Sequence, residues 1–276
     1  MNIKIVADSS SNLHRVEGNT VTTVPLKIVT DEREFCDDAS LEMEQMLEYM
    51  QGYSGRSGTS CPNVGDWLDA FGDAEAVFTV SITSGLSGCH NAAQQAARVY
   101  LDEYPDRKVC CLDTLSTGPE MVLIVEKLQE LISQGLSFEK IEKKIRTYME
   151  STHLLFMLEQ MENLANNGRV SPLVAKAAGL LGIRVVGSAS DKGTLQSEHK
   201  CRGEKKALST ILKCMVERGY EGGKVRIAHC ANVKAAVEMS ALIREVYPNA
   251  DVQLHECGGL CCFYAERGGL LVGYEA

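Results

Sequence analysis

The sequence lacks the patterns that mark membrane and secreted proteins. No apolar run among the 276 residues reaches the roughly 18 positions that a membrane-spanning helix needs. The first residues, MNIKIVADSSS, contain neither the basic stretch nor the long apolar core of a secretory signal. We therefore expect a cytoplasmic protein.

Basic residues are scarce relative to acidic ones. Lys and Arg number 28 against 37 Asp and Glu, which gives a formal net charge of −9 at pH 7. Proteins that neutralise a phosphate backbone cluster their Lys and Arg residues, so this balance disfavours nucleic acid as a partner. Because 45% of the residues are hydrophobic, the chain can bury a sizeable core in one large or two modest domains.

Several catalytic and metal-binding spacings are also missing. Eleven cysteines are present without any C-x-x-C pair, so thioredoxin-like motifs and common zinc knuckles lack their spacing. Their odd number in a long chain predicts that most are free, reduced and buried. The one metal candidate is Cys257, Cys261 and Cys262 with His255, and we predict no metal site there. Neither G-x-G nor G-x-S-x-G occurs, which removes the usual signals of a dinucleotide site and a hydrolase nucleophile.

Short apolar runs alternate with helical patterns in the first half of the chain. This alternation is typical of β-α units around a mainly parallel sheet. It predicts strands at residues 3–7, 77–82 and 108–112, and two long helices at 120–133 and 138–151. Residues 52–60 (GYSGRSGTS) are interpreted as a glycine- and serine-rich loop.

A domain boundary is predicted near residue 150, giving two α/β domains at 1–150 and 151–276. The second half again mixes strand and helix patterns. Strands are predicted at 153–158, 183–187, 225–229, 252–256 and 270–274, and helices at 159–167, 204–218 and 233–246.

Small polar residues follow each of the first three predicted strands. Because the carboxyl ends of parallel strands meet at one edge of a sheet, this edge is the expected place for a ligand. After the second strand comes Gly85-Leu86-Ser87-Gly88, directly before a helix. Amides at the helix start and the Ser87 hydroxyl can hold an anion there, or these residues can be an ordinary helix cap.

Two further stretches carry groups that suit an anionic ligand. Thr59 and Ser60 precede Pro62 and a predicted helix, so their hydroxyls either cap that helix or face a ligand. Arg169 lies on a turn after Asn167-Gly168, where a guanidinium suits a carboxylate or phosphate, or is simply solvated.

Taken in order, these stretches make the chain resemble the DegV family of bacterial fatty-acid-binding proteins from end to end. The seven matching stretches are Val6-Ala7-Asp8-Ser9-Ser10, Val24-Pro25-Leu26, Thr59-Ser60-Cys61-Pro62, Ile82 to Gly88 (ITSGLSG), Leu112-Asp113-Thr114, Asn167-Gly168-Arg169-Val170-Ser171 and Gly179 to Val186 (GLLGIRVV). The resemblance implies two α/β domains, the first three-layered with a mainly parallel sheet and the second with a mixed sheet. It also implies a long-chain fatty acid in a hydrophobic tunnel between them.

The resemblance further implies how the acid is held. Its carboxylate would lie between the hydroxyls of Thr59 and Ser87. We expect Ser60 and Gly88 to assist them, without a metal or a salt bridge, and the fatty acid to be the only ligand, without a further cofactor. Four residues of the strand-end loops would support this arrangement: Asp8, Ser9, Ser84 and Gly85. In some members the loaded protein presents the carboxylate to a separate ATP-dependent kinase, which makes acyl phosphate, and a transient, peripheral membrane contact is also compatible with such a carrier.

The chain departs from the family near its C-terminus. Where the family usually carries a histidine, Tyr264 stands in this sequence, and a phenol cannot become a cation near neutral pH. Arg169 and Arg202 match family arginines. With Tyr264 they are our candidates for contacts with a partner or a phosphate, with solvation as the alternative for the two arginines.

Two other functions remain open at this point. One is a lipid sensor that binds fatty acid without any kinase. The other is an enzyme acting on a small acid or its phosphate, with Asp8, Ser9, Asp113 and Arg169 around the strand ends. If the protein is a carrier, we expect that it turns over no soluble substrate by itself and that a bound lipid survives its purification.

Overall fold

A four-stranded sheet, parallel throughout, forms the centre of the N-terminal part. The computed structural model describes residues 2–16, 21–178 and 181–276; Gly179 and Leu180 of the GLLGIRVV stretch lie outside the described residues. In spatial order the strands are β2 (Thr22–Val24), β1 (Ile3–Asp8), β6 (Ala76–Ser81) and β7 (Lys108–Asp113). The three strands predicted in this region are confirmed.

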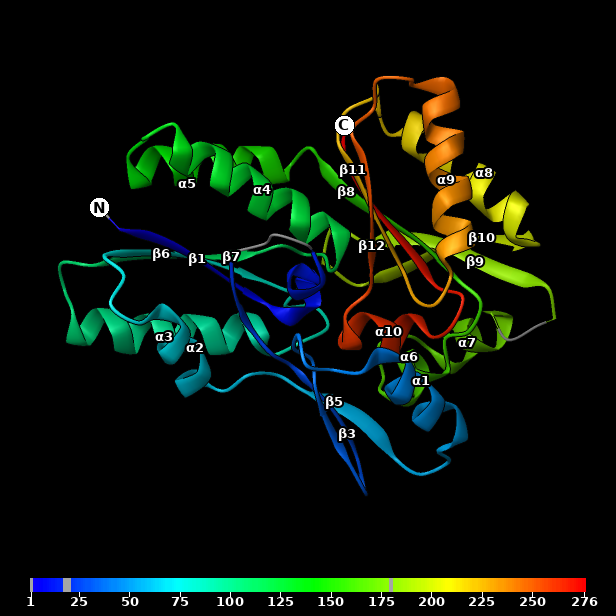
Figure 1. The fold of residues 1–276 in the computed structure, drawn as a ribbon, viewed down its shortest axis with the longest axis horizontal. Coiled ribbons are helices and arrows are strands. Elements are labelled where there is room, and N and C mark those ends of the chain that lie inside the picture. Colours follow the sequence, from blue (N-terminus) through cyan, green and yellow to red (C-terminus); the bar gives the residue numbers. More distant parts are fainter. Residues whose placement is uncertain (1, 17–20, 179–180) are drawn as a thin grey trace.

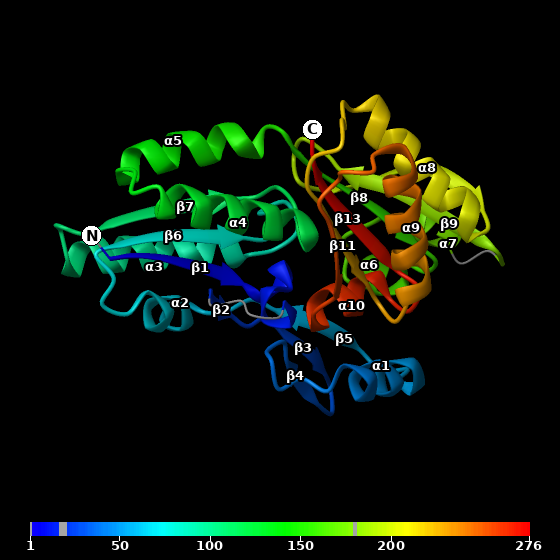
Figure 2. The ribbon, with the colours of Figure 1, turned by 45° about the horizontal axis from the view of Figure 1, so that its top comes forward.

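Helices cover both faces of this sheet (Figure 2). On one face lie α2 (Val64–Phe71) and α3 (Cys89–Glu103), and on the other α4 (Pro119–Ser133) and α5 (Phe138–Met149). Side chains alternate along a strand, so Val6 packs toward α2 and α3 while Ile5 packs toward α4 and α5. The predicted three-layer arrangement is confirmed.

A six-stranded mixed sheet organises the C-terminal part. In spatial order its strands are β10 (Leu195–Arg202), β9 (Ile183–Ala189), β8 (Thr152–Leu158), β13 (Leu270–Glu275), β11 (Val225–His229) and β12 (Val252–Glu256). Only β11 and β12 pair in parallel; the other neighbours are antiparallel. Helices α8 (Glu204–Glu217) and α9 (Val233–Val246) cover one face.

Strand β10 was not predicted, because its residues LQSEHKCR are too polar to resemble a strand. It forms by pairing with β9 at the edge of the sheet, with an irregularity between Ser197 and His199. An edge strand needs few apolar residues, since its outer side faces water.

A third, small antiparallel sheet shows that residues 52–60 are only partly a loop. Its strands are β4 (Glu34–Cys36), β3 (Lys27–Thr30) and β5 (Ser57–Ser60). The prediction of a loop as far as residue 60 was therefore wrong for its last four residues. Backbone pairing with β3 makes a strand of residues whose side chains do not favour one.

The small sheet and helix α1 (Met43–Gly52), which lies between β4 and β5 in the chain, pack against the second face of the mixed sheet and complete its core. Four short helices lie near the small sheet: α1 itself, α6 (Glu162–Asn166), α7 (Pro172–Ala178) and α10 (Gly259–Ala265). Ile28 and Met46 pack in the same buried cluster as Phe156 and Phe263. Residues early in the chain thus build the C-terminal core, and the predicted boundary near residue 150 stays a prediction.

The carboxyl ends of β1 and β6 point toward the mixed sheet, with α10 between the two halves (Figure 1). Two short 3-10 helices, η1 (Ser9–Ser11) and η2 (Leu13–Arg15), follow β1 at this junction. The ligand edge expected from the sequence therefore faces the second half of the chain.

All eleven cysteines lie in the described part of the chain and are free, and eight of them are buried. This confirms the prediction that most are unpaired and buried. No helix among the described residues is both long and apolar enough to cross a bilayer.

Because Glu120 is buried, we expect the stability of the protein to depend on pH in a specific way. This residue in the first turn of α4 is buried and accepts a hydrogen bond from Thr152 Oγ1 at 2.8 Å. Burial raises the pKa of its carboxyl from 4.5 to about 7. Between these values the folded protein binds more protons than the unfolded chain, so the free energy of unfolding falls as pH rises, by about 3 kcal/mol from this group.

We expect the free energy of unfolding of Glu120→Gln to fall less between pH 4.5 and pH 8 than that of the unmodified protein. Urea unfolding at a series of pH values measures the difference. Glu130→Gln, on the exposed face of the same helix, serves as the control and should leave the decline in place. An unchanged slope in the Glu120 variant would contradict the assignment.

Candidate functional site

Asp8 fixes the loop that follows β6. Its side chain is fully buried, and Oδ2 accepts a hydrogen bond from the Ile82 amide at 2.7 Å while Oδ1 accepts one from the Ser10 amide at 3.1 Å. Burial raises the pKa of this carboxyl to about 6. Asp8 thus stabilises the loop through hydrogen bonds and is not presented to a ligand.

Ser9 has a similar role for the neighbouring chain. Its Oγ accepts a hydrogen bond from the amide of Leu26 at 3.0 Å. Leu26 in turn lines the pocket described below. Asp8 and Ser9 therefore hold the segments behind the pocket and do not line it.

The loop at residues 83–88 is held against the turn between β9 and β10. Thr83 Oγ1 donates to the carbonyl of Gly193 at 2.8 Å, and the amide of Ser84 donates to Asp113 Oδ1 at 3.1 Å. A Cβ at Gly85 would lie 2.5 Å from the carbonyl oxygen of Lys192, so a larger residue would force the two segments apart. Gly85 and Ser84 thus position the loop.

An apolar pocket with a cavity volume of about 90 Å³ lies between the halves of the molecule. Much of its wall comes from one face of the mixed sheet, where Leu154, Phe156 and Leu158 of β8 stand beside Leu271 of β13. Alternate residues of β8 point to the opposite face, toward α8 and α9. Ligand pockets of proteins are mostly apolar, as this one is.

Few polar side chains line this pocket. Thr59, Ser87 and Tyr264 bring hydroxyls, Arg169 brings a guanidinium and Thr117 adds one more hydroxyl. Thr59 Oγ1 and Tyr264 Oη are hydrogen-bonded at 2.8 Å, although 205 positions separate them in the sequence. The structure thus brings Thr59, Ser87, Arg169 and Tyr264 to one pocket. None of the described residues that line it is acidic.

Arg169 gives the polar group of the pocket a positive charge. Its Cζ lies 5.6 Å from the centre of the Tyr264 ring, and Nη1 donates to the carbonyl of Asn167 at 2.5 Å. Burial raises the pKa of the Tyr264 phenol, so this group remains a neutral donor. We expected the acid to be held without a salt bridge, and this stays a prediction, with Arg169 among the residues that line the pocket.

Ser87 stands at the entry to α3. Its Oγ donates to Cys89 Sγ at 3.2 Å and accepts from the Cys89 amide at 3.3 Å. Gly88 beside it is the N-cap of α3 and is exposed. The helix start thus has small residues next to the Ser87 hydroxyl, and its first amide donates to that hydroxyl.

Ser60 and Arg202 do not join the pocket. Ser60 follows Thr59 on β5 and is exposed, because successive residues of a strand point to opposite sides. Arg202 is exposed at the end of β10. Neither appears among the residues that line the pocket.

The cysteine-rich segment suggested as a metal candidate is packed into the core. The Cys261 thiol donates to the carbonyl of Ser10 at 3.4 Å, and burial raises its pKa to about 12. In the described chain, the group whose ligand atoms all lie within 4.8 Å is instead Glu198, His199 and Cys214. Glu198 is already paired with Arg218 Nη2 at 2.6 Å, which leaves that group unsuited to a cation.

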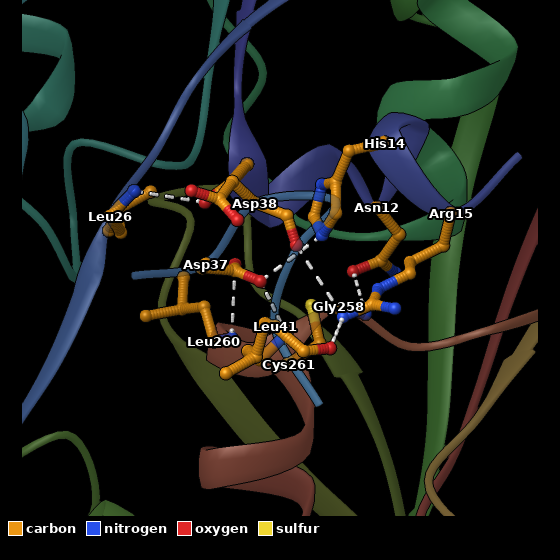
Figure 3. Close-up of polar contacts among 12 residues, drawn as sticks. Asn12, His14, Arg15, Leu26, Asp37, Asp38, Leu41, Gly258, Leu260 and Cys261 are labelled. Atoms are coloured by element: carbon orange, nitrogen blue, oxygen red, sulfur yellow. Dashed lines mark hydrogen bonds and ion pairs between the residues drawn. The ribbon is translucent and has the colours of Figure 1, made fainter. Parts of the chain in front are cut away.

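Helix α10, which carries Tyr264, is anchored by residues that sequence reasoning missed. The buried carboxyl group of Asp37 accepts hydrogen bonds from the amides of Gly259 and Leu260, the latter at 3.1 Å (Figure 3). Asn12 Oδ1 accepts one from the Gly258 amide at 2.8 Å. In the sequence, Asp37 resembles a solvated acid beside Asp38, so no local signal identifies it.

The same anchor requires close approach of the backbone. A Cβ at Gly258 would lie 2.7 Å from His14 Cε1, and His14 Nε2 is 3.2 Å from Asp37 Oδ1. Asn12 adopts a left-handed backbone conformation with φ of 62° to present its side chain. These contacts fix the start of α10 against the end of β1.

Together, the fold and the site define a class: an α/β protein with two main sheets and, between them, an apolar pocket that bears a few polar donors. The chain belongs to the DegV family, described as a family of uncharacterised proteins, and the match covers residues 2–276.

Curated relatives match along their whole length. A DegV domain-containing protein of Streptococcus pneumoniae (strain ATCC BAA-255 / R6) is 45% identical over 279 residues, covering 100% of this chain and 99% of that protein. A DegV domain-containing protein of Streptococcus gordonii is 43% identical, again covering 100% and 99%.

Two solved structures share the fold closely. A DegV family protein from Eubacterium eligens, loaded with heptadecanoic acid, has a TM-score of 0.97 and 45% identity, covering 99% of each chain. The Fatty Acid Kinase (Fak) B3 protein of Streptococcus pneumoniae, loaded with linoleic acid, also has a TM-score of 0.97 and 45% identity, covering 100% of this chain and 99% of that one.

Removal of the Asp37 carboxyl should destabilise the protein. Asp37→Ala leaves two buried amides at the start of α10 without acceptors, and we expect the free energy of unfolding to fall by about 3 kcal/mol. Urea unfolding measures the change. Asp38→Ala is the matched control, because Asp38 contacts Ser40 locally, and it should cost less than about 1 kcal/mol. Equal losses in both variants would refute the anchoring role.

Proposed function

We propose that this protein binds a long-chain fatty acid and carries it for a separate ATP-dependent kinase. The observation that carries the proposal is the apolar pocket in which Thr59, Ser87 and Tyr264 present hydroxyls beside Arg169. It is supported by the two neighbours at 45% identity that are loaded with heptadecanoic and linoleic acid.

The tail supplies most of the affinity. A chain of roughly fifteen methylenes gains about 0.8 kcal/mol for each one removed from water, or on the order of 12 kcal/mol in all. Loss of free motion offsets much of this gain. The leucine and phenylalanine walls of β8 and β13 offer the tail no hydrogen-bonding groups, so they select for hydrocarbon.

The carboxylate is held by the polar group. A buried carboxylate must find donors, and the hydroxyls of Thr59, Ser87 and Tyr264 are on hand, with the amides next to Gly88 at the start of α3. The bond between Thr59 and Tyr264 opens so that both donate to the ligand. The positive guanidinium of Arg169 lowers the free-energy cost of burying the negatively charged carboxylate. Ser60 has no part in this arrangement.

The protein acts as a carrier and not as an enzyme in this proposal. The rival enzyme interpretation relied on Arg169 together with Asp8, Ser9 and Asp113. The side-chain oxygens of the last three accept hydrogen bonds from backbone amides of the protein itself. The kinase partner is supported by the similarity to the Fak B3 protein. The sensor remains as the second candidate and is separated by experiment below.

Fatty-acid binding is tested directly with the purified protein. We expect mass spectrometry of its extracted ligand to find a fatty acid, and Thr59→Ala with Ser87→Ala to weaken binding about 100-fold in calorimetry. The physical reason is the loss of two charge-assisted hydrogen bonds while the tail contacts remain.

Ser60→Ala is the matched control, because its hydroxyl lies next to Thr59 in sequence yet is exposed. It should keep the affinity of the unmodified protein. An unchanged affinity in the double variant would overturn the assignment of the carboxylate to Thr59 and Ser87.

The carrier role is tested with the loaded protein, a cognate kinase and ATP. Acyl phosphate should form in the complete mixture and in none that lacks the kinase. Tyr264→His restores the residue usual in the family and serves as the comparison. Loaded protein that yields no acyl phosphate in either form would favour the sensor over the carrier.

A further inference from the structure

Cys61 differs from every other cysteine of the chain. It directly follows β5, and it is the only exposed cysteine of the eleven, all of which lie in the described part of the structure. Cys89, which begins α3, is fully buried. One accessible thiol thus stands near one protected thiol.

The two thiols meet at Gly88. A Cβ on Gly88 would lie 3.4 Å from Cys61 Sγ, so the sulfur of Cys61 rests against the residue that precedes Cys89. The interaction between the two side chains lowers the pKa of the Cys61 thiol and raises the pKa of the Cys89 thiol. The exposed sulfur is therefore the one that ionises.

Cys36 and Cys110 have the opposite character. Burial raises the pKa of the half-exposed Cys36 to about 11 and that of Cys110 to about 12. An accessible thiolate is the form that attacks peroxides in solution, whereas a buried thiol does not meet them and reacts only with a neighbouring group.

We propose that Cys61 and Cys89 are a modification site, a thiol pair that a hydroperoxide oxidises to a disulfide beside the Ser87 hydroxyl. The Cys61 thiolate attacks the peroxide oxygen, the O–O bond breaks, and the products are Cys61 sulfenic acid and hydroxide (alkoxide from an organic hydroperoxide). The Cys89 thiol then attacks the Cys61 sulfur, the S–O bond breaks, and its oxygen leaves as water with the Cys89 proton. The peroxide gains the two electrons that the two sulfurs lose.

The pair is coupled to the ligand pocket by contact. Ser87 Oγ donates to Cys89 Sγ at 3.2 Å, and Cys89 packs with Leu26, Ile82 and Leu260, which also line the pocket. If the carboxylate binds at Ser87, which rests on the proposed function, its charge disfavours the Cys61 thiolate. Loading with fatty acid then slows the oxidation.

The experiment uses the full chain after delipidation, treated with hydrogen peroxide, followed by alkylation of the remaining thiols and peptide mass spectrometry without reductant. We expect a peptide linked through Cys61 and Cys89, and Cys61 to react at least about tenfold faster than Cys36. Cys61→Ser should leave Cys89 reduced. In Cys89→Ser the oxidation should stop at a Cys61 sulfenic acid that dimedone traps.

Cys36→Ser is the control and should give the same linked peptide. Absence of the linked peptide in the delipidated protein, or Cys61 reacting no faster than Cys36, overturns the thiol pair and leaves the proposed function untouched. Equal oxidation rates for empty and loaded protein overturn the carboxylate position at Ser87 and leave the thiol pair standing.

Discussion

The anchoring of α10 by Asp37 is the contact on which the pocket depends. A helix of seven residues is too short to be stable through its own backbone hydrogen bonds. It is held because a buried carboxyl group, 222 positions earlier in the chain, accepts its first amides. Only with α10 in this place does Tyr264 contact Thr59 and does Leu260 line the pocket. One buried polar contact thus joins the two ends of the sequence into a single site.

Acidic groups of the junction lie behind the pocket wall rather than in it. Asp8 is fully buried near the site, but its oxygens accept from Ile82 and Ser10. Its repulsion of a bound anion is limited further because burial raises its pKa to about 6, which favours the neutral form over an ordinary aspartate. The polar group itself offers neutral hydroxyls and one guanidinium. This distribution suits a ligand with one negative charge and a long apolar remainder.

Sequence reasoning succeeded where local patterns are strong. Strands β11 and β12 and helix α9 have the predicted limits, since period-two and period-3.6 patterns are clear there. It failed where pairing overrides local preference, as in β5 and β10, which are polar edge strands. It also placed Ser60 beside Thr59 in the site, because only the strand assignment shows that the two side chains diverge.

The sequence by itself determined the two-part α/β architecture and the polar strand ends, because these follow from periodicity. The pair Thr59 and Ser87 was implied by the resemblance of its motifs to those of the DegV family. The tertiary structure alone decided that Arg169 and Tyr264 share the pocket with them, that Asp37 anchors α10, and that Cys61 rests against Gly88. These contacts join residues far apart in the chain. No local pattern encodes such distances, since they are set by how the sheets and helices pack.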